Sequence, residues 1–133
     1  MRYHDFHLKG YTVSDFGATI VLHLIWNYPG QTKAESHIQF SGVECYHFVH
    51  THGAIITEIE EETLSVFVRT EEAFLSSSAK EHGLRLWRTD AADYLCRLEG
   101  EGFRAWRIES AIGFTGFVVG RTIAEANTPI PAR

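Results

Sequence analysis

Alternation of apolar side chains constrains this chain more than any other feature of its sequence. Over residues 18–26, every second side chain from Ala18 through Leu22 to Trp26 is apolar, whereas the intervening positions are mixed. Successive side chains of a β-strand point to opposite faces, so this run predicts a strand with one face in a hydrophobic core. Similar runs recur along the sequence and predict that much of the chain builds one sheet.

Turn-forming residues separate these runs. Asp15 suits the entry to a turn and Gly17 supplies a positive φ, so residues 14–17 predict a turn. Pro29 cannot donate to a strand ladder and Gly30 relaxes the backbone, so both mark a break. The short connections favour an antiparallel meander over crossover units.

The third predicted strand contains a change of phase. Its apolar side chains switch faces between Ser41 and Gly42, which predicts a β-bulge there. The predicted strands span residues 3–13, 18–26, 37–49, 54–59, 64–68, 103–110 and 114–123.

Two helices are predicted before the last two strands. The first begins at a Thr70 cap, with acidic residues facing the positive end of the helix dipole, and ends at Gly83. The second covers residues 89–98, with Gly100 after its last turn. The sequence therefore predicts a single α+β domain, dominated by an antiparallel sheet of about seven strands with two short helices inserted.

Length and composition fit one domain with a sizeable core. A chain of 133 residues buries roughly two thirds of its unfolded surface, and 44% hydrophobic residues argue against disorder. We expect the domain to span residues 1–126, followed by a frayed tail at 127–133. No apolar run is long enough to span a membrane and the start lacks a signal peptide, which predicts a cytoplasmic protein. Cys45 and Cys96 lack a paired spacing, so free thiols are favoured over a disulfide, which stays open.

Charge is distributed unevenly along the chain. Residues 1–66 contain three Lys or Arg against eight Asp or Glu, a balance of −5, whereas residues 67–133 contain nine of each. An acidic surface repels phosphate backbones, so nucleic-acid binding is disfavoured and a basic partner is favoured. The alternative is that the acidic residues only keep the protein soluble.

Histidines suggest a metal site. On a strand, His50 and His52 point to the same side, and Asp5 and His7 form a similar pair near the start of the chain. Zinc needs three or four such ligands, so both pairs would have to contribute, which requires the first strand to lie nearby. A metal-dependent enzyme built on them is one hypothesis, although no cofactor and no catalytic residue follows from the spacing alone.

Aromatic residues offer a different site. Trp87, Phe103 and Trp106 could line a small-molecule pocket between the sheet and the helices, which would make the protein a carrier. The alternative is that these rings only fill the core. Cys45, with His47 two residues away, alternates with apolar neighbours and is better explained as a core residue than as a nucleophile.

The order of several segments resembles a known group of proteins. These segments are His4-Asp5, residues 38–43 followed by Tyr46 and Phe48, and residues 106–113. They are similar to small bacterial domains of unknown function, some of which are predicted immunity proteins of polymorphic toxin systems. The resemblance implies a sheet-rich, non-enzymatic, cytoplasmic protein, and acidic inhibitors of this kind steer onto basic nuclease toxins.

A binding module is therefore the function that we expect from the sequence. Its partner is a basic protein, and an exposed edge strand could also pair two copies of the chain. The predicted partner-binding residues, together with exposed residues around His50 and His52, are Glu58, Glu60, Glu61 and Glu62.

Overall fold

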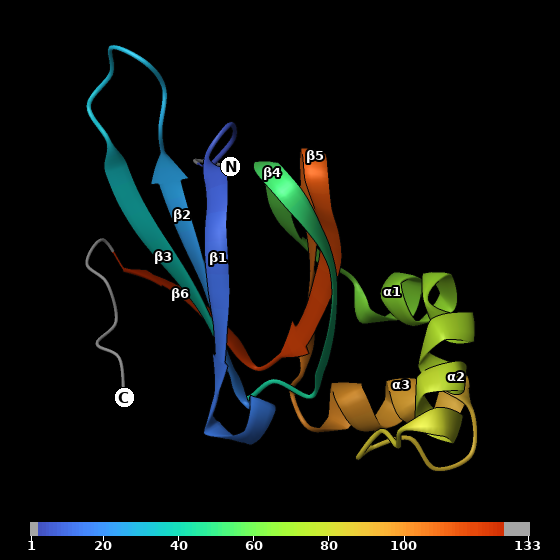
Figure 1. Ribbon diagram of the computed structural model, residues 1–133. Helices are drawn as coiled ribbons and strands as arrows, with labels where there is room; N and C mark the ends of the chain where they lie inside the picture. The colour runs from blue at the N-terminus through green and yellow to red at the C-terminus, as the bar shows by residue number, and fades with distance from the viewer. Residues whose placement is uncertain (1–2, 127–133) are drawn as a thin grey trace.

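The computed structural model describes residues 3–126 and confirms the α+β class (Figure 1). The strands are β1 (His7–Ser14), β2 (Thr19–Trp26), β3 (Ala34–Ser41), β4 (Cys45–Glu62), β5 (Arg104–Gly120) and β6 (Thr122–Ala126). The helices are α1 (Leu64–Thr70), α2 (Glu72–Glu81) and α3 (Ala91–Gly100), and a 3-10 turn (Asp15–Gly17) joins β1 to β2. The strands form one antiparallel sheet in the order β5-β4-β1-β2-β3-β6, within a single domain.

The sheet is curled, because its two edge strands follow each other in the chain. Only Arg121 separates β5, at one end of the strand order, from β6 at the other end. Figure 1 shows the chain crossing between them at the lower end of the sheet. The inner face of the curl encloses a core whose most deeply buried members include Ile20, Leu22, Leu24, Phe40, Ile56, Ile108 and Val118.

The long ladder between β4 and β5 bends in the middle. Its register is interrupted between His50 and Glu58, and Gly53 and Gly113 have φ values of +85° and +82° near the interruption. A Cβ atom added to Gly113 would lie 2.9 Å from the Cα and N atoms of Ala54. Glycine is therefore required at position 113 both for the backbone conformation and for this close approach.

The helices cover the outer side of the β4–β5 ladder, to the right of the sheet in Figure 1. They form a second core with β5, in which Phe67 of α1 packs on Phe117 with ring centroids 4.8 Å apart. The helix predicted over residues 89–98 is α3, which begins at Ala91 and includes Gly100 instead of ending before it. Asp90 caps it, since its carboxylate accepts a hydrogen bond of 2.9 Å from the backbone N–H of Asp93.

The prediction of about seven strands and two helices differs from the six strands and three helices observed in residues 3–126. Residues 64–68 were predicted as a strand, but they lie in α1, because Leu64, Phe67 and Val68 have helical spacing and pack together against the second core. Thr70 ends α1 and does not cap the next helix, which begins at Glu72.

The third and last predicted strands also have different bounds. The predicted bulge at Ser41–Gly42 is a turn, since Gly42 has a φ of +62° and β3 ends there before β4 begins at Cys45. The segments 103–110 and 114–123 are mostly one bent strand, β5. The predicted tail, residues 127–133, lies outside the described residues.

Two further sequence expectations concern thiols and membranes. Cys45 and Cys96 are both free thiols. Among residues 3–126, no helix has the length and apolar character needed to cross a membrane.

Replacing Gly113 with alanine should destabilise the protein by more than about 2 kcal/mol, because the new Cβ meets the Ala54 backbone in a left-handed conformation. Urea denaturation of both proteins measures the difference. Gly100→Ala is the matched control, since Gly100 lies in α3 with open space around its Cα and should gain about 0.5–1 kcal/mol. Equal stability of Gly113→Ala and the wild type would contradict the role assigned to the bend.

Candidate functional site

Three of the four predicted metal-ligand candidates line one cavity. His7, His50 and His52 share a cavity of about 480 Å³, which we call the histidine cavity. Among residues 3–126, its lining is His7, Leu8, Lys9, Ile25, Asn27, His50, His52, Gly53 and Ala54. Asp5 is not part of this lining, and its carboxylate lies 3.2 Å from the Nδ1 atom of His4.

The histidine cavity opens where the sheet loses its pairing. β1 and β4 are paired only through His7 and Ile55, and beyond this point Tyr11 of β1 packs on Phe48 and His50 of β4 with ring-centroid distances of 4.9 and 5.9 Å. Within residues 3–126, no set of three or more His, Cys, Asp or Glu side chains is arranged to hold a metal ion. The histidines are therefore neighbours around a cavity, but they do not converge on one point.

The four predicted partner-binding glutamates have different surroundings. Glu61 pairs with Arg104, and Glu62 lies 3.0 Å from an Arg107 guanidinium nitrogen. Glu58 and Glu60 are instead close enough to share a hydrogen bond when one of them is protonated. This contact, together with the negative charges of Glu58 and Glu109, raises the pKa of Glu60. Repulsion therefore remains among three exposed or partly exposed carboxylates on the β4–β5 ladder.

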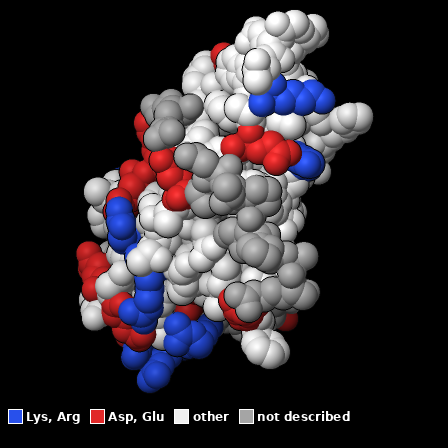
Figure 2. Space-filling view, turned by 90° about the vertical axis from the view of Figure 1, so that its left-hand side faces the viewer, with Lys and Arg blue, Asp and Glu red and all other residues white. Residues whose placement is uncertain are grey.

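Acidic and basic side chains are mixed elsewhere on the surface. Figure 2 shows Asp and Glu alternating with Lys and Arg along the left edge and lower end of the face that contains β3. The net charge of −5 therefore does not produce a uniformly acidic surface on this side.

The predicted ligand-pocket residues are distributed over two cores. Trp106 lies in the core inside the curled sheet, with its ring 5.5 Å from that of Phe40. Phe103 belongs to the second core, and Trp87 packs at its margin. None of the three lines the histidine cavity or the cavity beside the 3-10 turn described below.

An exposed aromatic residue lies on the 3-10 turn. The side chain of Phe16 is fully exposed, and both Asp15 and Phe16 have left-handed backbone conformations, with φ values of +54° and +58°. Three other large apolar residues nearby on β1 and β4 are exposed, and together with Phe16 we call them the aromatic surface: Tyr11, Val13, Phe16 and Tyr46. The rings of Tyr11 and Tyr46 both contact that of Phe48, and Tyr46 lines one cavity together with Phe16.

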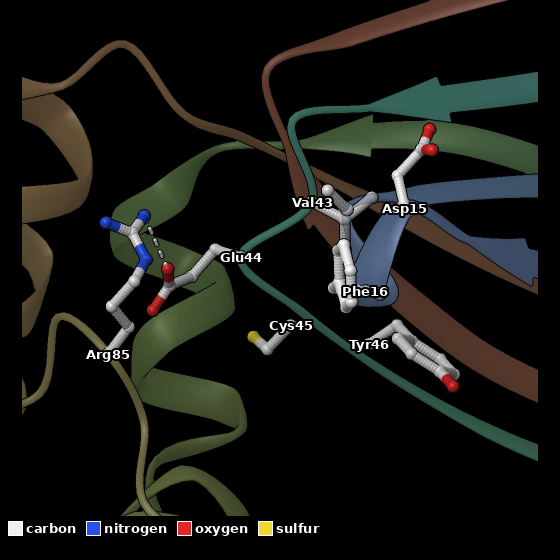
Figure 3. A pocket seen from close by; sticks show the side chains of 9 residues that line it. Asp15, Phe16, Val43, Glu44, Cys45, Tyr46 and Arg85 are labelled. Carbon is white, nitrogen blue, oxygen red and sulfur yellow. Dashed lines mark hydrogen bonds and ion pairs between the residues drawn. The ribbon is translucent and has the colours of Figure 1, made fainter.

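A second cavity of about 520 Å³ lies beside Phe16, between the 3-10 turn and the loop that carries Arg85. Figure 3 shows Phe16 and Tyr46 on one side of this turn cavity and Glu44 with Arg85 on the other. Cys45 lies between them, and burial raises the pKa of its thiol to about 12. The thiol therefore stays protonated at neutral pH and does not supply a nucleophile.

Glu44 connects the sheet to the helical part of the protein. Its side chain is inaccessible to solvent, and its carboxylate accepts hydrogen bonds from Arg85 at 3.0 Å, the backbone N–H of Leu86 at 3.2 Å and the Tyr94 hydroxyl at 3.4 Å. Burial is the largest influence on this group and raises its pKa, although the three donors favour the charged form.

A histidine pair occupies the outer face of β2 and β3. The Nδ1 atoms of His23 and His37 are 2.7 Å apart, and His23 Nε2 lies 2.7 Å from the Thr12 hydroxyl oxygen. His37 is 95% buried, and its Nε2 atom has no hydrogen-bond partner within the part of the chain that the structure describes. A buried lone pair is tolerated better than a buried N–H without an acceptor, so His37 Nδ1–H donates to His23, and His23 Nε2–H donates to Thr12.

No family model matches the sequence, and no curated protein or solved structure was found to be similar to it. Neither the aromatic surface nor the histidine pair was predicted from the sequence. The position of Phe16 next to Gly17, in a predicted turn, was the one sequence signal that its side chain could be exposed. The histidine pair depends on the register that places His23 opposite His37, which the sequence does not show.

Replacing Glu44 with alanine should lower the free energy of unfolding by about 2–4 kcal/mol, because the Leu86 N–H and the Tyr94 hydroxyl lose a buried acceptor. Glu44→Gln keeps an acceptor oxygen and should lose about 1 kcal/mol. Glu81→Ala on α2, whose side chain is 65% exposed, serves as the control and should change stability by less than about 0.5 kcal/mol. Thermal and urea denaturation measure these differences, and equal effects of the three substitutions would contradict the connecting role.

The histidine pair should make stability depend on pH. Burial, followed by the charges of His37 and Lys9, lowers the pKa of His23, so the neutral ring stabilises the fold above the unfolded histidine pKa of about 6.5. This stabilisation should be lost as the pH falls below that value and through the lower folded pKa. Urea denaturation between pH 5 and pH 8 should show a smaller decline for His23→Gln than for the wild type. His82→Gln on an exposed site is the control, and an identical decline in both variants would exclude this pair as the cause.

Proposed function

We propose that this chain is a non-enzymatic binding module for a basic protein, with the aromatic surface at the centre of the interface. The observation that carries the proposal is Phe16, a fully exposed aromatic side chain in a left-handed backbone conformation. The left-handed region costs a residue with a Cβ atom about 1–2 kcal/mol. A large ring that lies in solvent at such a position contributes little to the fold of the free protein.

Binding gives the exposed ring a physical role. Residues that dominate protein interfaces are enriched in aromatic side chains, which lie near the centre and fill pockets on the partner. Phe16 and Tyr46 stand on the same side of the turn cavity, opposite Glu44 and Arg85, so a partner side chain could enter between the two aromatic rings and the ion pair. Exposed apolar groups that gather on one part of a protein commonly mark such a surface.

The partner's charge follows from the charge of this chain. The net charge is −5, and Asp15 lies beside Phe16 at the rim of the turn cavity. Repulsion among Glu58, Glu60 and Glu109 would also decrease near a cation. A basic protein is therefore attracted at long range and held by the aromatic surface at short range. The resemblance to predicted immunity proteins of toxin systems agrees with this class of partner.

Substituting Phe16 should separate stability from binding. Phe16→Gly and Phe16→Asn remove the ring and accept left-handed φ values more readily, so we expect the free protein to be as stable as the wild type or up to about 1 kcal/mol more stable. The same variants should weaken partner binding about 30-fold or more, which is the effect of losing an aromatic hot spot. Calorimetric melting measures the first effect and surface plasmon resonance the second.

The partner for this experiment is recovered by cross-linking the tagged wild-type chain in its own cells. The proposal expects a protein with excess Lys and Arg, whose association slows as salt is added. Val66→Gln removes an exposed apolar side chain from α1 and should leave the affinity unchanged. A partner that binds the wild type, Phe16→Asn and Val66→Gln equally would exclude the aromatic surface, and an acidic partner would contradict the proposed class.

A further inference from the structure

We propose that the histidine cavity binds a small organic oxyanion, a phosphate or carboxylate group attached to a short apolar body. This site is separate from the aromatic surface and goes beyond the proposed protein-binding function. Three imidazoles, one ammonium group and one amide contribute to the lining, from His7, His50, His52, Lys9 and Asn27. No Asp or Glu residue is among the lining residues of this cavity.

The hydrogen-bonding state of His7 supports an anion. Its Nδ1 atom is buried and has no hydrogen-bond partner among residues 3–126. As a lone pair this atom is tolerated, whereas as an N–H it would be a buried donor without an acceptor. The ring proton of neutral His7 is therefore on Nε2, which leaves that nitrogen as the donor available to a ligand.

Local strand geometry brings Lys9 to the same cavity. The β1–β2 register shifts between Leu8 and Gly10, so Lys9 is the additional residue of a bulge. Its ammonium nitrogen lies 3.2 Å from a carboxylate oxygen of Glu35, and both side chains are substantially exposed. Exposed ion pairs of this kind stabilise little, so an anion in the cavity can compete for Lys9.

The size and remaining lining define the ligand class. About 480 Å³ exceeds the needs of one inorganic ion and falls in the range of small-molecule sites. Leu8, Ile25 and Ala54 add apolar surface to the same lining. The separated oxygen atoms of an oxyanion can meet donors that do not converge on one point, which suits this arrangement better than a metal ion.

Few charged groups surround the cavity. Lys9 is the one Lys or Arg side chain in the described lining, and Glu35 faces the cavity only through its ion pair with Lys9. An anion is therefore attracted by Lys9 and bound by the N–H donors of the lining.

The test is a titration of the full chain with small probes. Binding is measured by isothermal titration calorimetry and by changes in the histidine side-chain resonances in NMR spectra. The probes are phenyl phosphate, benzoate and inorganic phosphate, with benzyl alcohol as an uncharged probe of similar size. We expect at least one of the three anions to bind with a dissociation constant below about 1 mM at pH 7 and to shift the resonances of His7, His50 and His52. Comparison of phenyl phosphate with benzoate identifies the preferred head group.

Matched variants locate the binding site. His52→Gln and Lys9→Gln should each weaken anion binding about tenfold, whereas Glu35→Gln releases Lys9 and should strengthen it about threefold. His82→Gln on an exposed site should have no effect. Because Glu35→Gln predicts a gain, a general loss of folding cannot imitate the expected pattern.

Several results would overturn the proposal. These are the absence of binding by all three anions at 10 mM, binding of benzyl alcohol as tight as that of the anions, or equal affinities in His52→Gln, Lys9→Gln and His82→Gln. Zn²⁺ binding that shifts the three histidines when no anion does so would show a metal site instead. None of these results bears on Phe16, so the protein-binding function is tested independently.

Discussion

The close contact between Gly113 and Ala54 is the constraint on which the shape of the sheet depends. A ladder as long as that of β4 and β5 would project beyond a small domain if it ran straight. The bend near Gly53 and Gly113 brings both halves of the ladder against the rest of the chain, so Ile56 and Phe114 enter the same core as β2 and β3. β5 can then pass through Arg121 into β6 and close the curl on the far side of β3.

The class of fold could be predicted from the sequence because it depends on local periodicity. β2 is an example, since its alternation determines both its existence and its buried face. The bent ladder could not be predicted in this way, because glycines at the bend resemble those at the end of a strand. Leu64–Thr70 illustrates the related ambiguity of short apolar segments, which match strand and helix equally well until their packing partners are known.

The candidate sites show the same division between local pattern and long-range arrangement. His50 and His52, which were predicted to point to the same side of a strand, both line one cavity, and His7 lines it too although it is more than 40 residues away. The glutamates at residues 60–62 do not share one environment, because two of them form ion pairs with arginines that are distant in the sequence. Arg104 and Arg107 reach Glu61 and Glu62 from β5, so neighbouring acidic residues on one strand have unequal charge environments.

Both proposed binding surfaces originate in the incomplete pairing of β1 with β4. Only His7 and Ile55 pair these strands, so Lys9–Ser14 of β1 has a hydrogen-bonded neighbour on the β2 side alone. Where the hydrogen-bonded pairing of β1 with β4 ends, the two strands contact each other through side chains, as in the packing of Tyr11 on Phe48. At one end of this opening lies the histidine cavity, and at the other end β1 runs into the turn that carries Phe16. Full pairing of β1 with β4 would bury the edges of both strands. Because most of these two strands are not hydrogen-bonded to each other, this region of the sheet supplies exposed groups suited to binding.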